Sequence, residues 1–396
     1  MATDTATLAP RPSRPAPWRD PRVRAIAVQV LFVAAVAAVG WFLVHNTLVN
    51  LRRQNIATGF GFLDREAAFG IGESLIDYSP ADTYFRAFLV GLTNTLYVSA
   101  LGIVLATILG TVMGLARLSG NWLVAKLAQI YVETFRNIPL ALQLLFWRGL
   151  LREAAPAPRQ AWQILPDVFV SNRGIVFPVP VADPVFSWMA LAGVAGIAAT
   201  WAVIRWAAAR QARTGEPFPT GWAGLALILG LPAAVFFAAG APLRLDVPAL
   251  RGFNFTGGSG VSPEFAALLL GLVIYTASFI AEIVRAGILA VSWGQSEAAM
   301  ALGLKPGQRM RLVVLPQALR VIVPPMTSEY LSLTKNSSLA VIIGFPDLVN
   351  IANTTMNQTG QAVEGIALIM AVYLAISLLI SLVMNFYNRA VALVER

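Results

Sequence analysis

The feature that most constrains this chain is a series of long apolar segments that contain no Asp, Glu, Lys or Arg. The five charge-free segments are residues 25–44, 87–116, 185–204, 221–241 and 365–388. A helix rises about 1.5 Å per residue, so about 20 apolar residues are enough to cross the hydrocarbon core of a bilayer. Hydrophobic residues make up 57% of the chain and charged residues only 12%. A soluble protein could not bury that much apolar surface, so we predict an integral membrane protein.

Three further segments are long enough to span a bilayer but carry charges. They are residues 127–147 with Glu133 and Arg136, residues 265–291 with Glu282 and Arg285, and residues 321–345 with Glu329 and Lys335. Backbone polar groups cannot be satisfied by lipid, so spanning segments of this kind are expected to be helices. The predicted fold class is therefore an all-α integral membrane protein with about eight transmembrane helices.

The distribution of basic residues predicts the orientation of the chain. Eight crossings place both termini on one side of the membrane, and an excess of Lys and Arg marks the cytoplasmic side. With the N-terminus inside, the inner segments carry more basic than acidic residues, whereas the outer loops do not. The first apolar run follows an arginine-rich stretch and precedes no small-residue cleavage site, so we predict a retained helix. Both termini and the loop 296–316 are predicted to be cytoplasmic.

Several function classes are excluded or disfavoured by residues that the chain lacks. There is no cysteine, and His45 is the single histidine, so no thiol chemistry and no multi-histidine metal site is expected. No catalytic residues and no cofactor are predicted. The chain contains no Gly-x-x-x-x-Gly-Lys-Ser/Thr phosphate loop, so it cannot be an ATP-hydrolysing unit. The net charge of +9 is attributed to arginines at the membrane surface rather than to nucleic-acid binding.

A short polar and basic loop separates two of the long apolar segments. Glu297, Ala298 and Ala299 are good helix formers, and their small neighbours allow close packing in a groove of another protein. Gly303 can adopt a positive φ and end this helix with a sharp turn. Leu315 and Pro316 mark the return to the membrane. The alternative interpretation is an ordinary basic connection between two helices.

The residues of this loop resemble the signature loop of permease subunits of bacterial ABC importers. The pattern is Glu-Ala-Ala, three residues, Gly, nine residues, Ile, one residue and Leu-Pro, and the chain departs from it only at Val313. Residues 91–96, 133–140, 281–285 and 332–339 are similar to the polar amino-acid uptake branch of these permeases, the histidine and glutamine permease type. The long central insertion resembles the broad-specificity L-amino-acid permeases.

This resemblance implies a five-helix permease core with an added N-terminal helix and a two-helix insertion. The implied organisation is a cytoplasmic tail (1–24), an extra helix and periplasmic loop (25–86), the first part of the core (87–150), the insertion (151–262) and the second part of the core (263–396). The implied location is the inner membrane of a Gram-negative bacterium, surrounded by lipid. The implied partners are two cytoplasmic ATPase subunits, a second permease subunit in a heterodimer and a periplasmic amino-acid-binding protein. The ATPases would dock on Glu297, Ala298, Ala299, Gly303, Leu315 and Pro316.

Charged residues inside spans are costly, so they usually pair or line a cavity. Glu282 and Arg285 are three residues apart on one helix face, so they can pair, or Glu282 can accept a substrate ammonium. Glu133 and Arg136 have the same spacing near a helix start, which favours a structural pair or a gate contact.

Other polar residues in the spans can also have either a structural role or a role in substrate binding. Lys335 and Asn336 can hold an unwound turn, contact a substrate carboxylate, or form hydrogen bonds between helices. Asn94 can line the substrate path or link two helices. The glycine pair of residues 110–114 fits a small-xxx-small packing pattern, to which we assign no partner.

The function predicted from these patterns is a permease subunit of an ATP-driven amino-acid importer. The main alternative is an ion-coupled secondary amino-acid transporter that uses Glu282. It would be expected to show inverted repeats and paired broken helices, which the sequence does not reveal. A third class, an intramembrane enzyme, would have little chemistry available from one histidine and no cysteine.

Overall fold

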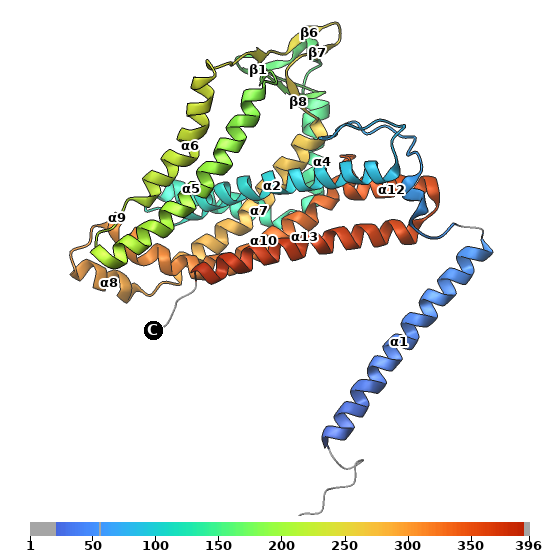
Figure 1. Ribbon diagram of the computed structural model, residues 1–396, viewed down its shortest axis with the longest axis horizontal. Coiled ribbons are helices and arrows are strands. Elements are labelled where there is room, and N and C mark those ends of the chain that lie inside the picture. Colours follow the sequence, from blue (N-terminus) through green and yellow to red (C-terminus); the bar gives the residue numbers. More distant parts are fainter. Residues whose placement is uncertain (1–20, 55–56, 392–396) are drawn as a thin grey trace, which may run out of the picture.

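The computed structural model describes residues 21–54 and 57–391, most of which are helical (Figure 1). The helices are α1 Pro21–Arg53, α2 Tyr84–Arg117, α3 Trp122–Asn137, α4 Leu140–Gly149, α5 Pro184–Thr214, α6 Thr220–Ala238, α7 Pro263–Leu289, α8 Trp293–Ala301, α9 Pro306–Arg309, α10 Leu315–Asn336, α11 Ala340–Ile343, α12 Leu348–Thr359 and α13 Ala362–Val391. Within the described residues, six helices are long and apolar enough to cross a membrane, or seven if one bent pair counts as a span. The predicted helical membrane fold is confirmed, but the count of eight spans is not.

Helix α7 is the centre of the bundle and packs against α2, α3, α4 and α10. Its closest neighbour is α2, which approaches it through two glycines. A Cβ added at Gly110 would lie 2.6 Å from Cβ of Ile280, and one added at Gly114 would lie 2.7 Å from the carbonyl oxygen of Ala281. The small-xxx-small pattern therefore has a partner, which is α7 of the same chain.

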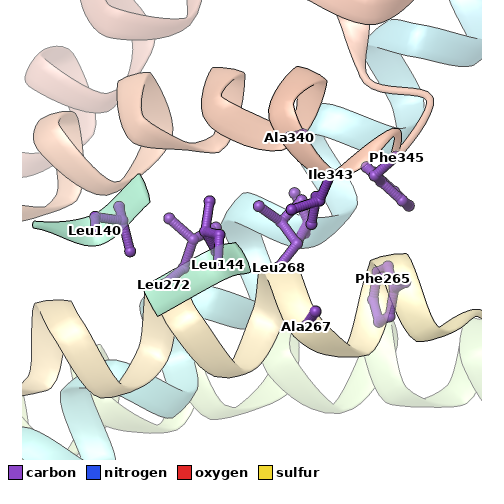
Figure 2. Packing of buried hydrophobic residues seen from close by; sticks show 10 residues of the cluster. Leu140, Leu144, Phe265, Ala267, Leu268, Leu272, Ala340, Ile343 and Phe345 are labelled. Atoms are coloured by element: carbon purple, nitrogen blue, oxygen red, sulfur yellow. The ribbon is translucent and has the colours of Figure 1, made fainter. Parts of the chain in front are cut away.

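Helix α4 fills the space between α7 and the short helix α11. Figure 2 shows Leu140 and Leu144 of α4 beside Leu268 and Leu272 of α7, and these four side chains are all buried. Ala340 and Ile343 of α11 belong to the same cluster. Close packing of these side chains provides van der Waals contacts that hold α4 and α11 against the central helix.

The segment 127–147, predicted as one span, is two helices. Helix α3 ends at Asn137, Ile138 has an extended backbone, and α4 begins after Pro139. Proline has no backbone N–H to donate and disfavours a helical conformation in the residue before it. The break is therefore a local consequence of Pro139, and neither piece alone meets the length required of a span.

The segment predicted at residues 321–345 also differs from a single straight span. Helix α10 begins earlier, at Leu315, and continues to Asn336 in spite of two internal prolines. A 3₁₀ turn and α11 follow, and α11 ends at Gly344 with a φ of 82°. The next helix, α12, is bent by 50° from this direction.

The central insertion consists of the helical hairpin α5–α6 and a layer of short strands. The strands are β1 Trp162–Leu165, β2 Val168–Ser171, β3 Gly174–Phe177, β4 Val179–Pro180, β5 Leu245–Asp246, β6 Ala249–Arg251, β7 Asn254–Thr256 and β8 Ser259–Val261. They form an antiparallel sheet of order β1-β2-β3-β8 and two pairs, β4-β5 and β6-β7. We predicted the two helices but no strands, because strands of two to four residues are too short to show a repeating pattern.

Helix α1 stands apart from the rest of the structure (Figure 1). None of its apolar window is buried by other described residues. It begins at Pro21 and continues to Arg53, so residues 21–24, assigned to the cytoplasmic tail, are helical. The bilayer determines how much of a helix must be apolar, but not how far the helix extends into the aqueous layers. The remainder of the predicted tail, residues 1–20, lies outside the described residues.

The close contact of α2 and α7 predicts a difference between two glycines. In Gly110→Ala the new Cβ would meet Ile280 and the carbonyl oxygen of Ala277, so we expect a loss of about 1–3 kcal/mol of stability. In the control Gly40→Ala, the new Cβ lies in open space on α1. Thermal unfolding of the purified protein, followed by size-exclusion chromatography, should show a lower midpoint for Gly110→Ala alone. Equal midpoints would contradict this packing.

Candidate functional site

The loop predicted to be functional contains helices α8 and α9. Glu297, Ala298 and Ala299 lie within α8, as expected from their helix propensity. After α8 the N–H of Leu304 donates to the carbonyl of Ala299 at 3.1 Å, and the N–H of Gly303 donates to that of Met300 at 2.9 Å. These two bonds form a Schellman motif, which requires the positive φ of 75° found at Gly303. The predicted turn geometry is confirmed.

Helix α8 has one face against the chain and one face open. Ser296 and Ala299, three residues apart, are buried. Glu297 and Ala298 are exposed, and so are the large apolar side chains of Trp293 and Leu302, at 66% and 81%. Large apolar side chains are thus exposed at both ends of α8, outside the helices long enough to span a membrane.

The end of the loop is connected to the beginning of α10. A π-helical turn, Met310–Val314, leads directly into α10, whose first residues are Leu315 and Pro316. The side-chain amide of Gln317 donates to Oε1 of Gln295 at 3.4 Å, which links the first turn of α10 to α8.

Glu282 joins the ends of α2 and α7. Its carboxylate accepts hydrogen bonds from Arg285 on the same helix, with Nη2 of Arg285 2.5 Å from Oε1. It also forms an ion pair with Arg117, the last residue of α2. Arg117 was not among the predicted site residues, although it directly follows the charge-free segment 87–116. Both oxygens of Glu282 are thus occupied by arginines.

Glu133 and Arg136 bond elsewhere rather than to each other. Oε1 of Glu133 accepts from the amide of Gln129, one helical turn earlier, at 2.7 Å. The guanidinium of Arg136 lies over the ring of Phe279 on α7, 4.9 Å from its centroid. Arg136 therefore links α3 to α7 by a cation–π contact, and a gate role for it stays a prediction.

A polar cavity of about 270 Å³ lies between α7 and α10. Tyr275, Thr276 and Phe279 line it from α7, and Glu329, Ser332, Lys335 and Asn336 line it from α10. It brings a carboxylate and an ammonium to one cavity among aromatic side chains. Lys335 and Asn336 lie in the last turn of α10, which is helical rather than unwound. Glu329 was visible in the sequence only as a charge within a span, and its place in the same cavity as Lys335 was not predicted.

Asn94 lies far from that cavity, near the beginning of α7. Its side chain is buried and donates from Nδ2 to the carbonyl oxygens of Glu73 and Pro346, each at 2.9 Å. It thereby ties the loop before α2 to the break between α11 and α12. Burial raises the pKa of the Glu73 carboxyl, which accepts a hydrogen bond from the Ser262 hydroxyl.

The polar residues predicted for one substrate path are therefore at three levels of the bundle. Asn94 lies near the beginning of α7, Lys335 and Asn336 beside its middle, and Glu282 and Arg285 near its end. Among the described residues there is no group of three or more His, Asp or Glu that could hold a metal ion.

Comparisons with known proteins identify the family of the chain. A family described as binding-protein-dependent transport system inner membrane component matches residues 102–393. The chain is 52% identical to a general L-amino acid transport system permease protein of Rhizobium johnstonii, over 95% of this chain and 94% of the relative. It is 53% identical to a putative amino-acid ABC transporter permease protein of Escherichia coli, over 96% and 97%. It is 44% identical to a glutamate/glutamine/aspartate/asparagine transport system permease protein of Rhodobacter capsulatus, over 95% and 96%.

Proposed function

The chain belongs to the family of binding-protein-dependent transport system inner membrane components, and we propose that it is the permease subunit of an ATP-driven importer for amino acids. The observation that carries this proposal is the likeness over nearly the whole chain to permease proteins whose names specify amino acids. The name of the Rhizobium relative, a general L-amino acid system, favours a broad range of L-amino acids. The breaks at Ile138 and Gly344 are compatible with an ion-coupled transporter, but the likeness over nearly the whole chain is to permeases of binding-protein-dependent and ABC systems.

Two features of the chain indicate its partners: it has no phosphate loop, and helix α8 has an exposed face. Since it has no phosphate loop, ATP hydrolysis requires a separate subunit. We assign the exposed face of α8, with Glu297, Ala298 and Leu302, to a cytoplasmic ATPase. Two ATPases, a second permease subunit and a periplasmic amino-acid-binding protein would complete the importer. The excess of arginine on one side supports an inner-membrane orientation with both termini and this loop in the cytoplasm.

Coupling would proceed through α10. Closure of the ATPases on ATP would displace α8, and the Gln295–Gln317 bond and the π-helical turn would carry that displacement into the first turn of α10. The same helix carries Glu329 and Lys335 into the polar cavity. A tilt of α10 would then change the access of the cavity to the two sides of the membrane.

We propose this cavity as the amino-acid site. Every amino acid has an α-ammonium and an α-carboxylate, which Glu329 and Lys335 can bind respectively. Recognition of the groups that all amino acids share is compatible with broad specificity. Glu282 is less suited to bind an ammonium, because Arg117 and Arg285 already occupy its oxygens. We assign Glu282 the role of holding the ends of α2 and α7 together.

The orientation can be tested with single cysteines, because the chain has none of its own. Ser259→Cys and Asn357→Cys lie in exposed outer positions of the proposed topology, and Gly307→Cys lies in the exposed loop. A membrane-impermeant maleimide added to spheroplasts should label positions 259 and 357, and should label position 307 only after lysis. Labelling of position 307 in intact spheroplasts would reverse the proposed orientation.

Gly303 provides the test of coupling. Valine at a φ of 75° is strongly disfavoured, so Gly303→Val should distort the turn after α8 without disturbing the membrane helices. We expect normal insertion, loss of amino-acid uptake, and ATP hydrolysis that no longer responds to loaded binding protein. The matched control is Gly307→Val, since a Cβ at either glycine meets open space but only Gly303 has a positive φ. Wild-type uptake by Gly303→Val would remove the loop from the mechanism.

Lys335 and Glu282 should behave differently when their charges are removed. Lys335→Gln removes a charge-assisted hydrogen bond to the substrate, so KM for uptake should rise about tenfold or more with little change in thermal stability. Glu282→Gln leaves Arg117 and Arg285 without their carboxylate, so it should lower the unfolding temperature. Uptake in proteoliposomes and thermal unfolding measure the two effects. If Glu282→Gln raised KM and Lys335→Gln did not, the two assignments would be exchanged.

A further inference from the structure

The α5–α6 hairpin has a surface that none of the proposed functions uses. The two helices pack on each other, with Gly196 so close that an added Cβ would lie 2.6 Å from the carbonyl oxygen of Leu227. The Thr200 hydroxyl lies at this contact, within 3.4 Å of the carbonyl oxygen of Gly224 on α6. Within the described chain neither helix has substantial contact with another helix. The face of α5 that points away from α6 is therefore open.

That open face is apolar along most of its length. Leu191, Val194, Ile197 and Trp201 follow one another at spacings of three or four residues, which places them on one side of the helix. Each of them is more than half exposed. Such a row in a spanning helix lies against hydrocarbon chains.

The chemistry of the face changes at the depth where the hydrocarbon ends. About 20 residues cross the hydrocarbon core, and the charge-free stretch from Val185 ends at Ile204. Arg205 is the next residue, and α5 continues to Thr214. Arg205, Arg210 and Arg213 therefore fall at or just beyond the headgroup layer. In Figure 1 the turn that follows α5 lies at the same end of the molecule as α8 and α9.

Aromatic rings support these arginines. The guanidinium of Arg205 lies 4.0 Å from the ring centroid of Trp201, and that of Arg210 lies 5.9 Å from that of Trp206. Arg210 is also paired with Glu216 at 2.7 Å. Arg205 and Arg213 are exposed and take part in none of the ion pairs found in the described chain. The end of the hairpin thus has an excess of positive charge.

We propose that this face binds an anionic phospholipid. An acyl chain would lie along the row from Leu191 to Trp201, and the phosphate would bind Arg205, which lies over Trp201. Arg213, about two turns further along α5, would add electrostatic attraction for the anionic headgroup. Along this face the apolar row comes first, then the interfacial Trp201, and then arginine without an ion-pair partner in the described chain. An anionic phospholipid has its acyl chains, its interfacial region and its charged headgroup in the same order. Arginine is well suited to phosphate because its planar guanidinium donates two parallel hydrogen bonds. The site involves neither the α8 surface nor the polar cavity.

Native mass spectrometry of the full chain in detergent can test this site. Titration with dioleoyl phosphatidylglycerol and with dioleoyl phosphatidylcholine should show preferential retention of the anionic lipid. Each arginine near a charged headgroup is worth about fivefold in affinity. Arg205→Gln combined with Arg213→Gln should therefore weaken phosphatidylglycerol binding about 25-fold and weaken phosphatidylcholine binding much less, because the choline cation offsets the charge of its phosphate. Trp201→Ala should weaken the binding of both lipids, since it removes apolar contact.

The control is Arg244→Gln combined with Arg251→Gln. These two arginines are exposed in the strand layer at the opposite end of the insertion, so their replacement should leave binding unchanged. The proposal is wrong if the wild-type chain shows no preference for the anionic lipid. It is also wrong if the Arg205 and Arg213 double variant retains that lipid as the wild type does, or if the control pair weakens binding equally.

Discussion

The close approach of other helices to α7 is the constraint on which the rest of this structure depends. Lipid chains are as apolar as leucine, so helices in a bilayer associate by close packing rather than by escape from water. Glycine provides that closeness on three sides of α7, through Gly110 and Gly114 of α2, through Gly271 beside Leu144 of α4, and through Gly287 beside Ile322 of α10. The ion pairs of Glu282 and the cavity beside Tyr275 can exist only because these contacts hold the neighbouring helices at short range.

Helix α10 connects the two parts of the chain that the proposed function requires. Its first turn is linked to α8 through Gln317, and its last turns present Glu329 and Lys335 to the cavity. The buried face of α10 packs on α7, while two prolines interrupt its backbone hydrogen bonds in between. A helix that is held on one face and weakened at its centre can bend at that point when its first turn is displaced.

The insertion is organised differently from the core. Its helices pack on each other through Gly196 and Gly224, and its strand β8 pairs with β3 immediately before α7 begins. The insertion is therefore joined to the core by the strand layer, whereas its hairpin is left to contact the surrounding membrane. This explains why the apolar residues of α5 are exposed over a whole face, while those of α7 are mostly buried.

Local sequence determined the membrane class, the positions of most spans, the α8 helix and the turn at Gly303, because hydropathy, helix propensity and glycine conformation act within a few residues. The partners of the polar residues were decided only by tertiary structure. Arg117 reaches Glu282, Glu329 faces a cavity that Tyr275 of α7 also lines, and Asn94 donates to the carbonyls of two distant loops. These partners lie at sequence separations that no local pattern reports. Those contacts depend on the rotation and depth of each helix relative to its neighbours. Interhelical glycine packing sets this rotation and this depth. A sequence pattern shows which face of a helix is apolar, but it does not show which other helix will cover that face.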